Sequence, residues 1–162
     1  MVKHSAGIAL CRTADDGSTE LLLVHPGGPY WNGKNEHAWS IPKGEFDPDL
    51  ENAVDCARRE FSEELGAELS LDGGLIELPV LKASGKHIHP FLAEGDFEPG
   101  SLQSNTTEIE WPPRSGQRIV IPEVDAAAWI RLDEAIKYLH KGQARLVDAV
   151  ASALGLELVA EE

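Results

Sequence analysis

The chain has 162 residues, of which 42% are hydrophobic and 26% are charged, and its formal net charge is −14. This length suits a single domain that spans residues 1–162. The acidic charge argues against nonspecific binding to nucleic acid or anionic membranes, which needs basic patches, but it leaves open a small phosphate-bearing substrate held through a divalent cation.

Two strands are predicted near the start of the chain. Residues 5–12 (SAGIALCR) and 20–26 (ELLLVHP) have the length and apolar density of strands. The turn residues TADDGST lie between them, so the pattern predicts a hairpin.

A long segment rich in Gly, Pro and Asn follows at residues 25–44. It carries three large aromatic side chains, Tyr30, Trp31 and Trp39. Long loops of this kind are often functional, but the rings can equally serve to pin the loop to the core. The sequence leaves both interpretations open.

An amphipathic helix is predicted over residues 52–65, and Gly66 is a natural C-terminal stop for it. Its apolar residues repeat at spacings of three and four and form one stripe: Val54, Ala57, Phe61 and Leu65.

The rest of the chain predicts more strands and two late helices. The expected strands are residues 75–82, 86–93, 107–111, 118–121 and 128–132. Asp133 is expected to cap a short helix that runs to His140. A final amphipathic helix is expected over residues 143–154, with Leu146, Val150 and Leu154 inward and Gly155 at its end. The pattern indicates a mixed α/β domain, with a sheet between helices.

Three glutamates lie on one flank of the helix at residues 52–65. At about 100° per residue, Glu60, Glu63 and Glu64 fall within an arc of about 100° that begins beside the apolar stripe. Arg59 lies one turn before Glu63, where its guanidinium can orient a carboxylate. Partly buried carboxylates raise one another's pKa unless a cation offsets them, and hard oxygen ligands suit Mg²⁺, Mn²⁺ or Ca²⁺.

The same helix can also be no more than the solvated face of an acidic protein. The preceding segment GEFDPDLE favours a cation site, because it brings backbone carbonyls, Glu45 and Glu51 toward the same flank. An EF-hand loop for Ca²⁺ is excluded. Counted from Asp47, its sixth position holds Asn52 instead of Gly, and its twelfth holds Arg58 instead of Glu.

Residues 44–67, GEFDPDLENAVDCARREFSEELGA, resemble the Nudix box of Nudix hydrolases. The glycines, the glutamates, the Arg-Glu pair and the apolar position all match: Gly44, Glu51, Arg59, Glu60, Phe61, Glu63, Glu64 and Gly66. The segment departs from the box in two ways, because one extra residue lies between Gly44 and Glu51, and Ala67 is smaller than the usual aliphatic. An extra loop residue leaves the helix in register, whereas one in the helix would turn the glutamates by about 100°.

Further stretches extend the resemblance. WSIPKG, at residues 39–44, is similar to the lead-in of Nudix enzymes that cleave diadenosine polyphosphates. HPGGPYW, EIEWPPRSG and PEVDAAAW are similar to a bacterial Nudix group described as predicted NTP pyrophosphohydrolases. The resemblance implies an α/β/α sandwich with a mixed sheet, a requirement for Mg²⁺ or Mn²⁺, and hydrolysis of a nucleoside diphosphate linked to another group.

The resemblance also implies roles for the residues of the box. Glu60 and Glu64 are the expected metal ligands, Glu63 is a further ligand or base, and the carbonyl of Gly44 is another ligand. Arg59 is expected to orient the glutamates without touching the substrate. We treat these five residues as the candidate catalytic and metal site.

Outside the box the sequence offers further candidates. Glu108 and Glu110 share one face of a predicted strand and are candidates for an extra base or ligand, although plain solvent exposure explains them as well. His87 and His89 alternate on another strand, and we expect them to face solvent and not to bind the metal. The candidates for holding phosphates are Lys43, Lys86 and Arg114, and those for stacking on a base are Tyr30, Trp31 and Trp111.

The leading hypothesis is a Mg²⁺- or Mn²⁺-dependent hydrolase of a nucleoside or dinucleoside polyphosphate. The alternatives are hydrolysis of another diphosphate, such as a nucleotide sugar or an inositol polyphosphate, and a Nudix-fold sensor that binds nucleotide without turnover. The intact set of glutamates speaks against a sensor. We expect a small-molecule nucleotide as partner, no nucleic acid, no membrane, and a monomer or homodimer.

The predicted location is the cytoplasm. No apolar run approaches the length of a membrane span, and residues 1–12 lack the apolar stretch of a secretory signal. Cys11 and Cys56 cannot make a disulfide framework and lie in apolar patterns. We therefore expect buried free thiols in a reducing compartment.

Overall fold

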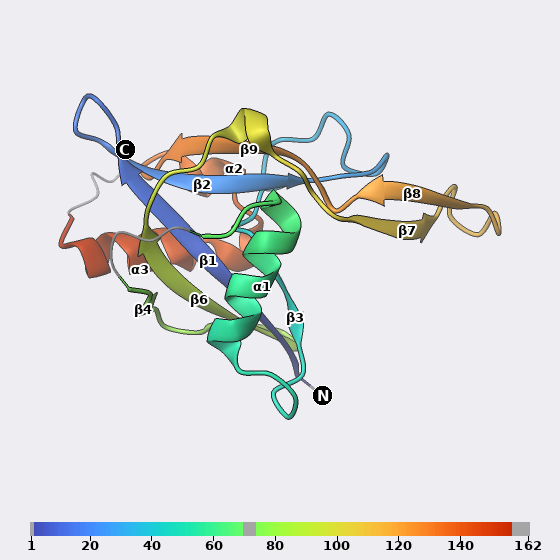
Figure 1. Ribbon diagram of the computed structural model, residues 1–162, viewed down its shortest axis with the longest axis horizontal. Coiled ribbons are helices and arrows are strands. Elements are labelled where there is room, and N and C mark those ends of the chain that lie inside the picture. The colour runs from blue at the N-terminus through green and yellow to red at the C-terminus, as the bar shows by residue number, and fades with distance from the viewer. Residues whose placement is uncertain (1, 70–73, 157–162) are drawn as a thin grey trace.

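The computed structural model describes residues 2–69 and 74–156, and within them the chain forms a seven-stranded mixed sheet with helices on both faces (Figure 1). The main path of the sheet runs through β4 (Ile76–Glu77), β6 (Lys86–Glu94), β1 (Lys3–Thr13), β2 (Thr19–Pro26) and β9 (Val124–Arg131). Off this path, β3 (Lys43–Phe46) pairs with β1, and β5 (Leu81–Ala83) pairs with β6. The β1–β6 pair is parallel, and the other pairs of these strands are antiparallel.

The sheet is covered by α1 (Ala53–Leu65) on one face and by α2 (Ala135–Tyr138) and α3 (Arg145–Leu154) on the other. The alternation of side chains along β1 explains both cores. Ile8 and Leu10 pack with Phe61 of α1, whereas Ala9 and Cys11 pack with Leu146 of α3. This is the α/β/α sandwich that the resemblance implied.

The ends of α1 are fixed by local chemistry. The side chain of Asn52 caps the first turn by accepting the backbone N–H of Asp55 at 2.8 Å. Gly66 ends the helix in the left-handed conformation, with φ at 74°. Between these caps Phe61 and Leu65 are buried against the sheet, so the rotation of the helix about its axis is set by the apolar stripe.

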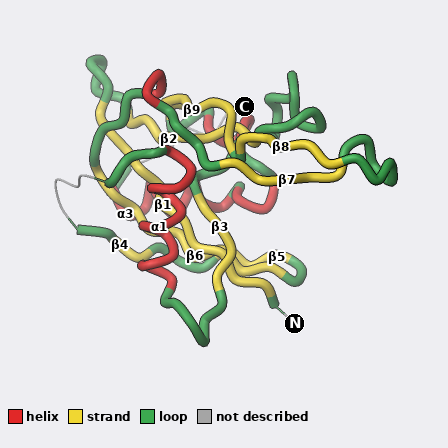
Figure 2. Tube along the Cα trace, turned by 45° about the vertical axis from the view of Figure 1, so that its right-hand side comes forward, coloured by secondary structure: helices red, strands yellow, loops and turns green. Residues whose placement is uncertain are grey.

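A second, two-stranded sheet projects from the body of the molecule (Figures 1 and 2). It consists of β7 (Thr106–Glu110) and β8 (Arg118–Pro122). Its base is attached to the end of α1, because the backbone N–H of Asn105 donates to the carbonyl of Glu63 at 2.9 Å and that of Glu123 donates to the carbonyl of Asn105 at 3.0 Å. The turn after β8 is thereby held next to the last turn of α1.

Most of the predicted elements are confirmed, with shifted ends in the later ones. The hairpin, the helix with its stop at Gly66 and the strands at 86–93, 107–111 and 118–121 all appear. The strand expected at 75–82 is split into β4 and β5 around Pro79, which has no N–H to donate to a sheet. The strand at 43–46 was not predicted, because four residues inside a loop carry no periodic pattern.

The end of the chain differs more from expectation. Asp133 does not cap α2 but pairs with Arg131 at 3.0 Å, and the helix begins at Ala135 without a side-chain cap. A 3-10 turn, η2 (Lys141–Gln143), precedes α3, which therefore begins at Arg145 and still ends at Gly155. A similar short turn, η1 (Pro99–Ser101), precedes β7.

Cys11 and Cys56 are both free and buried, as predicted. Burial raises the pKa of each thiol to about 11, so both are protonated at neutral pH. Among the described residues, no helix combines the length and the apolar character needed to cross a membrane.

Candidate metal and phosphate site

The helix α1 buries two of its three glutamates. Glu60 and Glu64, one turn apart beside the apolar stripe, are each 8% exposed, whereas the side chain of Glu63 is 40% exposed. The three glutamates therefore lie on one flank of α1, and this flank has a buried inner part and a more exposed outer part. Glu60 and Glu64 form the inner part.

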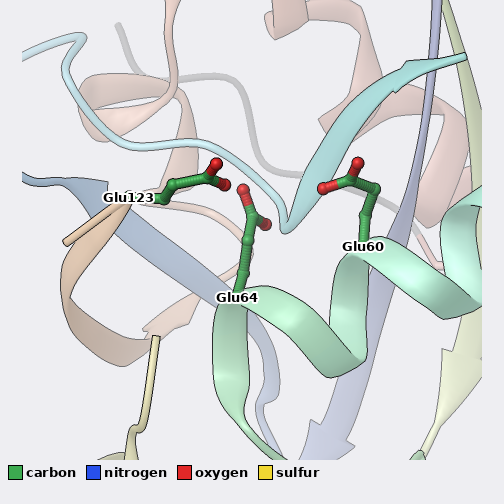
Figure 3. A group of neighbouring side chains, drawn as sticks. All are labelled: Glu60, Glu64 and Glu123. Carbon is green, nitrogen blue, oxygen red and sulfur yellow. The ribbon is translucent and has the colours of Figure 1, made fainter. Parts of the chain in front are cut away.

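A third carboxylate completes this inner part. Glu123, from the turn between β8 and β9, points its carboxylate toward that of Glu64 (Figure 3). One oxygen from each of Glu60, Glu64 and Glu123 lies within 4.8 Å of the others. Within residues 2–69 and 74–156, no other set of three carboxylate, imidazole or thiol groups converges in this way. We call these three residues the carboxylate cluster.

Without a cation, the ionised form of the carboxylate cluster is electrostatically unfavourable. Burial, with the charge of Glu60 added, raises the pKa of Glu64 to about 9. Burial also raises the pKa of Glu60, against the opposing effect of Arg59, and it raises the pKa of Glu123 together with the charge of Glu63. Three ionised carboxylates at this spacing repel one another strongly in a poorly solvated site, so a divalent cation fits the cluster.

Arg59 holds the surrounding glutamates in place. Its Nε and Nη2 donate to the two oxygens of Glu51 at 3.0 and 2.9 Å. Its Nη1 donates to Glu60 at 3.0 Å and to Glu63 at 3.2 Å. The extra loop residue before Glu51 therefore does not prevent this bidentate pair from forming, and the contacts match the orienting role predicted for Arg59.

The strand β3 supplies backbone contacts to the same cluster. The backbone N–H of Lys43 donates to Glu64 Oε2 at 2.8 Å. Gly44 lies so close to Glu60 that a Cβ at this position would overlap the carboxylate. The carbonyl of Gly44 is 3.5 Å from the thiol of Cys56, which donates to it. Position 44 requires a glycine because the backbone of β3 approaches the Glu60 carboxylate so closely.

A cleft of about 280 Å³ opens beside the carboxylate cluster. Glu64 and Glu123 lie in its wall, together with Lys43, Lys86 and Trp31. Neither lysine forms an ion pair with any described residue, although the chain carries 28 acidic residues. The structure therefore brings together two predicted phosphate-binding lysines, a predicted stacking ring and two carboxylates.

Two further residues of this cleft were not identified from the sequence. Burial lowers the pKa of His140, and the nearby charges of Lys43 and Lys86 lower it further. Gln143 is 1% exposed, accepts the backbone N–H of Ile41 at 3.2 Å and donates to Ser40 Oγ at 2.9 Å. It fixes the backbone just before Lys43. No local pattern marks either residue, because both reach the cleft through the packing of the chain's last third.

Glu123 was also missed, although the stretch PEVDAAAW that contains it was noted. A single glutamate in a turn carries no periodic signal. The bonds that hold it are tertiary, such as the one from the backbone N–H of Gly27 to its carbonyl at 3.0 Å.

Several predicted candidates lie outside this site. Glu108 forms an ion pair with Arg118, and Glu110 accepts the backbone N–H of Arg114 at 2.9 Å. These residues and Trp111 belong to the projecting β7–β8 hairpin or its tip. None of the four predicted residues of this hairpin (Glu108, Glu110, Trp111 and Arg114) lines the cleft or joins the carboxylate cluster.

The remaining aromatic and histidine candidates are placed differently from expectation. Tyr30 is 57% exposed and meets the ring of Trp31 edge-on at 4.9 Å between centroids, so it lies against Trp31 and not in the cleft wall. We predicted that His87 and His89 face solvent, and the structure differs. They are half-buried and contact His4.

Comparison with known proteins identifies the family of the chain. The family model of the NUDIX domain matches residues 3–150. The m7GpppN-mRNA hydrolase of Saccharomyces cerevisiae is 30% identical over 105 residues, which cover 60% of this chain and 10% of the yeast protein. The chain thus spans about a tenth of that relative.

Two further proteins are similar over most of the chain. An uncharacterized 17.7 kDa protein of Enterobacteria phage T4 is 32% identical over 127 residues, covering 78% of this chain and 80% of the phage protein. The structure of a C. elegans Ap4A hydrolase in a binary complex superposes with a TM-score of 0.63 at 21% identity, covering 93% of this chain and 98% of the other. The family model spans nearly the whole described chain. The chain therefore belongs to the Nudix family.

Proposed function

We propose that the protein is a Mg²⁺- or Mn²⁺-dependent hydrolase that cleaves a phosphoanhydride bond in a dinucleoside polyphosphate. One observation carries this proposal: the cleft has carboxylates suited to a hard cation beside two lysines that form no ion pair with any described residue. Such a cleft is complementary to a cation-bound chain of phosphates.

The carboxylate cluster would hold the metal. Its donors are carboxylate oxygens, which suit Mg²⁺ and Mn²⁺ better than softer metals. A bound divalent ion would neutralise phosphate charge and activate water for attack. Gly44 remains a proposed ligand through its carbonyl, and Glu63, which lies at the edge of the cluster beside Arg59, remains a proposed further ligand or base.

The chain's own residues would bind and orient the substrate. Lys43 and Lys86 offer two ammonium groups to the phosphates, and His140 adds a donor that lies close enough for both lysines to lower its pKa. Arg59 keeps Glu60 in position without reaching the substrate. Trp31 offers the aromatic ring of the cleft for stacking on a base, with Tyr30 packed against it.

The preference for a long phosphate chain is supported by the two lysines and by the names of two similar proteins. Ap4A and m7GpppN-mRNA both contain nucleosides joined through several phosphates. A substrate of this kind would place some phosphates at the carboxylate cluster and others at the lysines. A two-phosphate substrate such as ADP-ribose would leave part of this cationic surface unused.

The test is a comparison of kcat/KM for diadenosine tetraphosphate, ATP and ADP-ribose with Mg²⁺, with products identified by chromatography. We expect diadenosine tetraphosphate to be preferred. The preference should depend on Lys86: we expect Lys86→Gln to raise KM for diadenosine tetraphosphate about tenfold, as for a lost charge-assisted hydrogen bond. Lys82→Gln is the matched control, because Lys82 is exposed on β5 and does not line the cleft. A clear preference for ADP-ribose would contradict the proposed substrate, and binding without turnover of any nucleotide would indicate a sensor.

A further inference from the structure

Three histidines lie together on the sheet, away from the carboxylate cluster. His87 and His89 are two residues apart on β6, so their side chains share one face. In the parallel pairing of β1 with β6, His4 is opposite His87 and Ala6 is opposite His89. All three imidazoles therefore lie on the face that carries α1, and we call them the histidine cluster.

Two of the three rings, those of His4 and His89, already approach each other through their nitrogens. His4 Nδ1 is 3.1 Å from His89 Nε2. Two nitrogens bound to one metal at about 2.0–2.1 Å are about 2.9–3.4 Å apart. The ring of His87 meets that of His4 edge-on, with 5.5 Å between centroids. Its nitrogens do not converge with the other two in the structure, so the proposed site requires His87 to rotate toward the pair. Phe46 forms a wall against His4 and His89 at 6.0 and 5.6 Å between centroids.

The surroundings of the cluster also suit ligation. Within the described chain, none of the three rings has a hydrogen bond or ion pair to a carboxylate. The rings are only half-buried, so an ion can reach them.

We propose that His4, His87 and His89 form a second metal site, which binds a borderline divalent transition metal such as Zn²⁺, Ni²⁺ or Cu²⁺. Imidazole nitrogens favour these ions over Mg²⁺, which prefers the oxygen donors of the carboxylate cluster. From the sequence alone only the pair on β6 was noted, and it was predicted not to bind the metal. The third ligand comes from β1, and only the parallel pairing of the two strands brings it there. This inference does not rest on the proposed function.

The test is isothermal titration of untagged protein with Ni²⁺ at pH 7.5 in excess Mg²⁺, which competes for the oxygen ligands of the carboxylate cluster. We expect one Ni²⁺ per chain. His4→Gln and His89→Gln should each weaken binding at least about tenfold, since each removes a ligand. His37→Asn is the matched control and should bind as the wild type does. His37 is a histidine outside the cluster at a positive φ of 54°, which Asn tolerates.

Two further measurements make the test specific. Glu64→Gln should bind Ni²⁺ as tightly as the wild type, because it alters only the carboxylate cluster. Ni²⁺ should broaden the imidazole NMR signals of His4 and His89 before those of His37 and His140. The site is refuted if the wild type binds no Ni²⁺, or if His4→Gln and His89→Gln proteins that melt like the wild type retain its full affinity. Loss of Ni²⁺ binding in Glu64→Gln with no loss in the histidine variants would likewise place the ion at the carboxylates and overturn the inference.

Discussion

Glu64 is the residue at which burial, charge and position in the cleft coincide. It is 8% exposed, accepts the backbone N–H of Lys43 and belongs to the carboxylate cluster. Replacement by Gln keeps its shape and removes an anionic ligand. We expect Glu64→Gln to lower kcat at least about a thousandfold, equivalent to about 4 kcal/mol in the transition state. Steady-state kinetics with diadenosine tetraphosphate and Mg²⁺ measure this effect.

The control for Glu64→Gln is Ser62→Ala on the same helix. The Ser62 side chain lies outside the carboxylate cluster and the cleft, so we expect nearly unchanged kcat. The metal-free fold of Glu64→Gln should persist, because Phe61 and Leu65 remain buried. If Glu64→Gln retained more than about a tenth of the wild-type kcat, a ligand of this strength would be ruled out.

At the scale of elements, the site depends on how closely β3 approaches α1. The backbone of β3 is fixed by its pairing with β1 and lies directly against Glu60. A Cβ at position 44 must therefore displace either the strand or the carboxylate. We expect Gly44→Ala to lower kcat/KM by about a hundredfold, as for a catalytic group misplaced by about 1 Å, and to lower the melting temperature.

Gly74→Ala is the matched control for this prediction. A Cβ at Gly74 meets no atom of the described residues within 4 Å, and the Gly74 backbone is not in the left-handed region. We expect both its activity and its melting temperature to equal those of the wild type. Wild-type kinetics in Gly44→Ala would show that β3 and Glu60 can move apart without cost, against the close approach argued here.

At the scale of the whole molecule, the metal and the pH should control stability together. In the metal-free protein the pKa of Glu64 is about 9, compared with 4.5 for an ordinary glutamate. Between these values the folded chain holds a proton that the unfolded chain has lost, so the free energy of unfolding falls as the pH rises through this window. Mg²⁺ binds the ionised cluster and should raise the melting temperature, and this increase should grow with pH.

Differential scanning fluorimetry from pH 5.5 to 8.5, with EDTA or with Mg²⁺, measures both effects. Glu64→Gln is the reference, because it cannot titrate at position 64. Its melting temperature still varies with pH through all the other titratable groups. If the wild type and Glu64→Gln showed the same pH dependence in EDTA, the raised pKa would be wrong. EDTA should also abolish turnover, and activity that survives full chelation would contradict a metal-dependent reaction.

The single domain over residues 1–162, the monomer or homodimer and the cytoplasmic location stay predictions at this scale. Size-exclusion chromatography with light scattering tests the oligomeric state.

The sequence by itself determined the helix α1, its stop at Gly66 and the spacing of its glutamates. These features are local, because the period of the helix fixes which side chains share a face, whatever the rest of the chain does. The position of the apolar stripe placed Glu60, Glu63 and Glu64 on one flank, and the resemblance of residues 44–67 to the Nudix box indicated the family and implied that Glu60 and Glu64 are the ligands. The same local logic failed for β3 and for the end of the strand at 75–82, where the segments are too short to show a period.

Only the tertiary structure decided which distant residues join that helix. Glu123 reaches the carboxylate cluster through the turn after β8, and Lys86 and His140 reach the cleft from β6 and from the segment before η2. The tertiary structure also shows that Glu108 and Glu110 lie outside the cleft, because their hairpin projects away from the body. Strand pairing and the packing of loops on the sheet set these positions. They depend on contacts between segments far apart in the chain, which leave no periodic trace in the sequence of either partner.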